Sequence, residues 1–111
     1  MNTRQEKVSK QIQKDMADII LHHSKEIAHG KILTVTEVRI TSDLGLARIF
    51  ISVFPSDNSK EIVTELNNRK GMYRNELSKK MRHQLKKMPE IEFFLDDSLN
   101  YVEKIDNLLK K

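Results

Sequence analysis

Two runs of strand-forming residues, separated by a short turn, constrain the fold of this chain most. Residues 32–41 and 46–54 are rich in Ile, Val and Thr, which favour β-strands. The second run alternates with the period of a half-buried strand, whereas Val35 and Val38 fall out of phase and predict a bulge in the first. Because residues 42–45 have turn composition, the runs predict an antiparallel hairpin. The predicted inward face of the second strand is Ala47, Ile49, Ile51 and Val53.

Helical periodicity flanks the hairpin on both sides. Before it, apolar residues recur at three- and four-residue steps, so we expect one helix over residues 3–28. After it, the apolar period from Ser59 to Met88 would give a straight helix about 45 Å long. A domain of this size has a radius of gyration of only about 13 Å. We therefore expect a helix–break–helix unit, with the break near Gly71.

A third strand and a last helix complete the predicted order. Pro89 ends the preceding helix, and residues 91–95 alternate as a short strand. Asp97 or Ser98 is expected to cap a last helix, so Asp96 and Asp97 are interpreted as helix-terminus residues and not as a catalytic acid pair. The apolar positions of that helix are Leu99, Val102, Ile105, Leu108 and Leu109. The order predicts an α+β domain whose helices pack on one face of a three-stranded sheet.

Composition excludes several classes of function. The 111 residues contain no Cys, so neither a disulfide framework nor a thiolate metal site is available. The polar N-terminus lacks the apolar run that a signal peptide needs, and no apolar run is long enough to span a membrane. The histidines lack the spacing of a metal site, and no catalytic motif is visible. We expect a single cytoplasmic domain over residues 1–111 that is not an enzyme and needs no metal or cofactor.

Positive charge is concentrated in one segment. The chain has a net charge of +4, but residues 69–88 hold eight basic residues against one Glu, a net +7 that leaves −3 for the rest. On the predicted helix, which runs to Met88, Lys79, Arg82 and Lys86 lie opposite the apolar stripe. Such a rigid outward ridge matches the repeating phosphates of a nucleic acid. The sequence therefore predicts RNA or DNA binding.

A solvated helix face is the simpler interpretation of this segment. Like charges four residues apart, such as Lys70 and Arg74, repel one another on a helix, and their retention favours an anionic partner. A module that docks its basic helix on an acidic protein surface is the alternative to nucleic-acid binding.

Two other charged groups carry weaker signals. The cations of the first helix are interleaved with acids, which is typical of a mixed solvated face. These cations are Arg4, Lys7, Lys10 and Lys14. An uncovered sheet face with Arg39, Arg48 and Phe50 would suit base stacking. Edge packing of Phe50 fits better, because no second exposed ring is evident in a chain with 5% aromatic residues.

Three segments resemble one known family. They are Arg4-x-x-Lys7-Val8; Thr41-Ser42-Asp43-Leu44 leading into Ala47-Arg48-Ile49; and Met88-Pro89-Glu90-Ile91-Glu92-Phe93-Phe94 followed by Asp96-Asp97-Ser98-Leu99. In this order they resemble ribosome-binding factor A, a bacterial maturation factor of the 30S subunit, and the resemblance runs from about Arg4 to Leu109. It implies a type II KH-like fold in which an Ala-x-Gly kink replaces the usual Gly-x-x-Gly loop. Here the matching positions are Arg69-Lys70-Gly71, with Arg69 in place of Ala.

The resemblance also implies a function. It implies binding to the immature 30S subunit and its 16S ribosomal RNA, and help in late maturation of the RNA precursor, notably in the cold. The free protein is expected to be a monomer. Because the Gly-x-x-Gly loop is absent, we expect recognition by shape and phosphate contact. The predicted RNA-binding residues are Arg69, Lys70, Gly71, Arg74, Lys79, Lys80, Arg82, Lys86, Lys87, Arg4 and Lys7.

Overall fold

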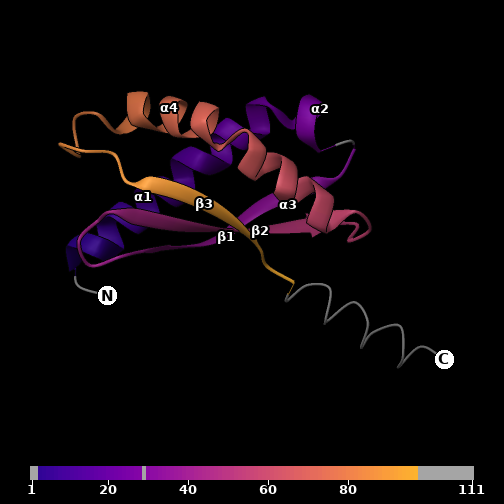
Figure 1. Ribbon diagram of the computed structural model, residues 1–111, viewed down its shortest axis with the longest axis horizontal. Helices are drawn as coiled ribbons and strands as arrows, with labels where there is room; N and C mark the ends of the chain where they lie inside the picture. Colours follow the sequence, from indigo (N-terminus) through magenta and orange to yellow (C-terminus); the bar gives the residue numbers. More distant parts are fainter. Residues whose placement is uncertain (1–2, 29, 98–111) are drawn as a thin grey trace.

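The computed structural model describes residues 3–28 and 30–97. Along this part of the chain the elements follow the predicted order, with one additional short helix, α2 (Figure 1). Their bounds are α1 Thr3–His22, α2 Ser24–Ile27, β1 Ile32–Ile40, β2 Leu46–Phe54, α3 Ser59–Asn68, α4 Lys70–Met81 and β3 Glu90–Leu95. The predicted last helix lies outside the described residues.

The three strands form one mixed sheet in the order β1-β2-β3. β1 and β2 pair antiparallel, which confirms the hairpin, and their register shifts between Val35 and Glu37, so the predicted bulge falls at Thr36. β3 runs parallel to β2 along its other side. Beyond the end of β3, Asp96 fixes this bulge: its Oδ2 accepts a hydrogen bond of 2.6 Å from the Thr36 hydroxyl.

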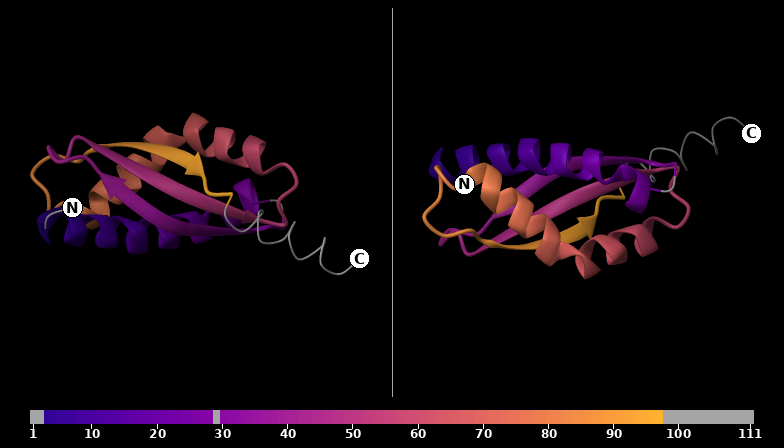
Figure 2. Two further views of the ribbon diagram at one scale, coloured as in Figure 1. Left: turned by 90° about the horizontal axis from the view of Figure 1, so that it is seen from below. Right: turned by 90° about the horizontal axis from the view of Figure 1, so that it is seen from above.

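The described helices pack on one face of the sheet, as predicted. Figure 1 shows α2, α3 and α4 above the strands, and the left view of Figure 2 shows the sheet from the opposite side. α1 packs on β1 and α3 packs on β3. The predicted inward face of β2 is confirmed, because Ala47, Ile49 and Ile51 are fully buried and Val53 is nearly so. None of the described helices is long and apolar enough to cross a membrane.

Amide side chains from the helices bind backbone groups of the two edge strands. On α1, Gln5 donates to the carbonyl of Ile40 at 3.1 Å, and Gln13 donates to the carbonyl of Val35 at 3.1 Å. On α3, the Asn67 amide donates to the Phe93 carbonyl and accepts from the Phe93 N–H, at 2.9 and 2.8 Å. These bonds fix each helix against its strand and occupy polar groups that an open edge would offer to another chain.

The first helical segment is broken once, which the sequence did not predict. α1 ends at His22, and His23 has φ −101° and ψ 11° before α2 begins. The His23 Nε2 lies 3.0 Å from a carboxylate oxygen of Glu76 on α4, and its ring meets the Tyr73 ring edge-on at 5.7 Å. The prediction of one helix over residues 3–28 was therefore wrong. It came from the local apolar pattern, which carries no information on these contacts with α4.

The predicted helix–break–helix unit is confirmed, with the break at Arg69. This residue separates α3 from α4 and has φ −103° and ψ 10°. Gly71, where the break was expected, lies inside the first turn of α4, and a Cβ there would meet nothing within 4 Å.

The prediction that the second helix of this unit reaches Met88 was wrong. α4 ends at Met81, and a turn follows in which the Gln84 N–H donates to the Met81 carbonyl at 2.8 Å. The start of β3 is fixed by a bond of 2.9 Å from the Glu90 N–H to the Gly45 carbonyl. Seven more helical residues would carry the chain about 10 Å further. The chain must instead turn back to reach the sheet.

Candidate nucleic-acid interface

The early end of α4 divides the predicted basic ridge. Lys79 and Lys80 lie on the last turn of α4, Arg82 caps it, and Lys86 and Lys87 lie in the following loop. The rigid helical ridge predicted from Lys79 to Lys86 is therefore wrong. Each of the predicted site residues has its own surroundings, which decide what it can bind.

The two lysines of the last turn face acids of α1. Lys80 Nζ lies 2.8 Å from Asp18 Oδ2, and this hydrogen bond raises the pKa of the lysine and lowers that of the aspartate. Lys79 lines a shallow hollow between α1 and α4 together with Asp18 and Glu76. This surface carries both signs of charge, so its attraction for phosphate is reduced.

Arg74 points toward the protein and not outward. Its Nε donates to the Pro89 carbonyl at 3.0 Å and its Nη2 to the Met88 carbonyl at 2.8 Å. The same Nη2 lies 3.6 Å from a carboxylate oxygen of Glu90. The predicted unpaired repulsion between Arg74 and Lys70 is therefore offset, and that argument for an anionic partner is wrong at this position.

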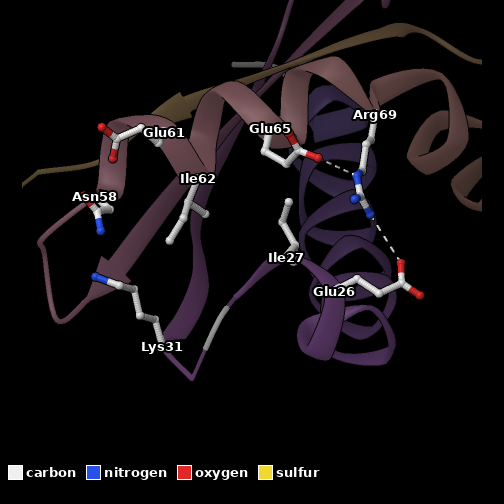
Figure 3. A pocket seen from close by; sticks show the side chains of 8 residues that line it. All are labelled: Glu26, Ile27, Lys31, Asn58, Glu61, Ile62, Glu65 and Arg69. Carbon is white, nitrogen blue, oxygen red and sulfur yellow. Dashed lines mark hydrogen bonds and ion pairs between the residues drawn. The ribbon is translucent and has the colours of Figure 1, made fainter.

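The positive charge of Arg69, at the break between α3 and α4, is also compensated by acids. Arg69 Nε donates to Glu65 at 2.8 Å, which raises the pKa of the guanidinium, and Nη1 lies 3.3 Å from Glu26 of α2 (Figure 3). These side chains line a hollow of about 590 Å³ that also contains Glu61. Lys70 and Gly71 follow on the first turn of α4. The two glutamates paired with Arg69, and a third on the same hollow, make this surface a poor site for phosphate.

Uncompensated cations gather at the other end of α4. Arg4 and Lys7 of α1 line a hollow of about 610 Å³ with Lys10, Lys14 and Gln84, so the loop after α4 lies beside α1. Arg4 also lines a second hollow, of about 370 Å³, together with Lys86 and Lys87, and the acids Asp43 and Glu90 line the same hollow without pairing with these cations. Figure 1 shows the start of α1, the β1–β2 turn and this loop at the same end of the molecule.

We call this surface the N-terminal basic face. It comprises Arg4, Lys7, Lys10, Lys14, Lys86 and Lys87. None of the six forms an ion pair within the described residues. Lys10 and Lys14 were absent from the predicted site. For Lys14 the sequence did contain an indication, because Arg4, Lys7 and Lys14 are spaced to lie on one side of a helix with Gln11.

The sheet face opposite the helices differs from its prediction. Phe94 supplies a second ring there, stacked on Phe50 with ring centroids 5.5 Å apart, so Phe50 does not pack at an edge. Arg39 covers the Phe50 ring at 5.6 Å and also pairs with Glu37 at 3.0 Å. Among residues 3–28 and 30–97, no group of three or more metal-ligand side chains gathers anywhere.

Comparison with known proteins decides the family. The family model described as ribosome-binding factor A matches residues 4–109. The chain belongs to the ribosome-binding factor A family. Ribosome-binding factor A of Christiangramia forsetii is 39% identical over 108 residues, which cover 96% of this chain and 82% of that protein. Ribosome-binding factor A of Chlorobaculum tepidum is 39% identical over 112 residues, which cover 99% of this chain and 91% of that protein.

Solved structures of ribosome-binding factor A share the fold. The crystal structure of the Thermus thermophilus protein matches with a TM-score of 0.69 and 18% identity, over 82% of this chain and 94% of that one. A homology model of the Thermus thermophilus protein, fitted into a cryo-electron-microscopy map of its complex with the 30S subunit, matches with a TM-score of 0.64 and 18% identity, over 80% and 91%. The predicted KH-like fold is thereby confirmed.

Proposed function

We propose that this protein binds the immature 30S ribosomal subunit through its 16S ribosomal RNA and assists late maturation of the RNA precursor. The observation that carries the proposal is the meeting of uncompensated cations from two distant segments on the N-terminal basic face. The protein acts as a single cytoplasmic domain, by binding and not by catalysis. The family membership and the 30S complex of the Thermus thermophilus protein support this choice of partner.

Phosphate contact explains why these cations form no ion pair among the described residues. A cation without an ion-pair partner releases a counterion when it meets a phosphate, and this release supplies the sequence-independent part of RNA affinity. The compensated cations Arg69, Arg74 and Lys80 would first have to leave an acid or a carbonyl. We therefore assign the contact to the N-terminal basic face and not to the break between α3 and α4.

Two double variants that remove the same charge test this assignment. Lys7→Gln/Lys86→Gln removes one cation from α1 and one from the loop, whereas Lys25→Gln/Lys60→Gln removes two exposed cations from α2 and α3. Affinity for a 16S ribosomal RNA transcript is measured over a range of salt concentrations. With about five phosphate contacts, the wild-type log–log slope is expected at roughly −3.5 to −4.5, and the first variant flattens it by about 1.4 to 1.8. The second variant leaves it unchanged.

Co-sedimentation with ribosomal subunits tests the partner. The wild-type protein is expected to sediment with immature small subunits and to be left behind by large subunits, and Lys7→Gln/Lys86→Gln weakens that binding. Equal sedimentation of both double variants would show that the N-terminal basic face is not the contact. If the salt slope for binding to the RNA transcript were flat, and the protein were retained by the subunit proteins without RNA, the result would instead support docking on an acidic protein surface.

A further inference from the structure

A side chain of α4 binds the loop after α4 where the loop returns to the sheet. Arg74 donates to two successive carbonyls, those of Met88 and Pro89, at 2.8 and 3.0 Å, from two different guanidinium nitrogens. Its Nη2 also lies 3.6 Å from Glu90, the first residue of β3. The side chain is 34% exposed. Hydrogen bonds from a charged donor are stronger than those between neutral groups, so this pair is a firm anchor for a loop.

The other anchors of the loop leave its basic tip free. At its start, the N–H groups of Gln84 and Leu85 donate to the Met81 carbonyl at 2.8 and 3.2 Å. Leu85 and Met88 are partly buried against the core. Between them, Lys86 and Lys87 are exposed and line the hollow that contains Arg4. The position of these two lysines therefore depends on the anchors on either side.

We propose that Arg74 is a positioning residue for RNA binding: it holds the return of the loop, so that Lys86 and Lys87 stay beside Arg4 at the spacing that phosphates require. This inference rests on the proposed function and deepens it. Nε and Nη2 of Arg74 already donate to the protein, so we assign this side chain a positioning role and not a phosphate contact. A lysine at this position keeps the charge but lacks the planar pair of donors that reaches both carbonyls.

A double-mutant cycle tests the proposal. Arg74→Lys is measured in the wild-type protein and in a loop-neutral protein, Arg82→Gln/Lys86→Gln/Lys87→Gln, by binding to a full-length 16S ribosomal RNA transcript at fixed salt. In the wild-type background we expect a loss of affinity of about fivefold to tenfold, the order of one ordinary intramolecular hydrogen bond. In the loop-neutral background we expect a loss of less than about twofold, because no basic tip remains to be positioned.

Two controls separate positioning from general damage. Hydrogen exchange of Arg74→Lys is expected to rise at amides 84–89 and to stay unchanged in the sheet. Glu90→Gln removes the 3.6 Å pair and also one acid from the hollow that contains Lys86 and Lys87, so it is expected to weaken RNA binding by less than about twofold. If Arg74→Lys is unfolded at the assay temperature, Arg74→Gln takes its place in the same cycle.

The outcomes are distinct. Unchanged affinity of Arg74→Lys in the wild-type background would overturn the inference, because charge alone would then suffice. An equal loss in both backgrounds would overturn it too, since Arg74 would act on the RNA directly or through the whole fold. Full affinity of the loop-neutral protein would instead overturn the assignment of RNA binding to the N-terminal basic face, and the inference with it.

Discussion

A buried phenol provides a sharp test of the packing between α1 and α4. Tyr73 is fully buried, and its hydroxyl has no hydrogen-bond partner among the described residues. Its ring meets the rings of His23 and Phe93 edge-on, with centroids 5.7 Å away in each case. Burial raises the pKa of the phenol, so the hydroxyl stays protonated. A buried hydroxyl without a partner costs about 1–3 kcal/mol.

Tyr73→Phe removes that cost and keeps the ring contacts. We expect the free energy of unfolding to rise by about 1 kcal/mol, at the lower end of the desolvation cost. With a urea m-value of about 1–3 kcal/mol/M, the midpoint of unfolding moves upward by about 0.3–1 M. Urea titration followed by far-ultraviolet circular dichroism measures the shift. Affinity for RNA is expected to stay the same, since Tyr73 does not line the hollows of the N-terminal basic face.

A second variant separates the hydroxyl from the ring. Tyr73→Leu removes both, loses the two edge contacts and leaves a cavity, so we expect it to lower the free energy of unfolding by about 1–3 kcal/mol. If Tyr73→Phe were itself destabilised by more than about 0.5 kcal/mol, the hydroxyl would have a partner in solution, and the reasoning from an unpaired buried group would be refuted.

Three further outcomes follow from the hydrogen bonds and ion pairs. Asn67→Ala leaves both backbone groups of Phe93 unpaired, so urea titration should show a loss of about 1–3 kcal/mol. Arg69→Ala breaks two exposed pairs with glutamates, and we expect a small fall in the urea midpoint that about 1 M salt abolishes, with RNA affinity within about twofold. Hydrogen bonds lower the pKa of Asp43, so its carboxylate stabilises the fold at pH values above the pKa that Asp43 has in the unfolded chain. Asp43→Asn should therefore lower the free energy of unfolding near neutral pH, and its difference from wild type should vanish well below about pH 4.

The strands and the helix break were predictable because each has a cause that is visible locally. The inward side chains of β2 differ in kind from the outward ones, and this alternation fixes both the strand and its buried face. The break came from a length argument, since a straight helix from Ser59 to Met88 would not fit on the sheet. That argument gives only the approximate position of the break, and the helix breaks at Arg69, two residues before the glycine.

The end of α4 had no local sign. Leu85 and Met88 continue the apolar period, and both do pack against the core, but from a loop. Periodicity reports which residues are buried and leaves open whether a helix buries them. The contacts that decide it, from Arg74 to the carbonyls of Met88 and Pro89, join residues 14 and 15 apart. The pair between Asp18 and Lys80 spans 62 residues, so charge compensation was equally invisible.

The short α4 also changes what the charge of this protein can do. A single ridge on one helix would present cations in one row, whereas the loop brings Lys86 and Lys87 beside the separate row on α1. From Arg4 to Lys14 that row is about 15 Å long, at about 1.5 Å per residue. One strand of a B-form DNA duplex, with about 3.4 Å per phosphate, carries about four phosphates over this length. Asp18, already paired with Lys80, bounds the row on α1. A surface with two rows of cations, limited by acids, is suited to hold one RNA backbone in place.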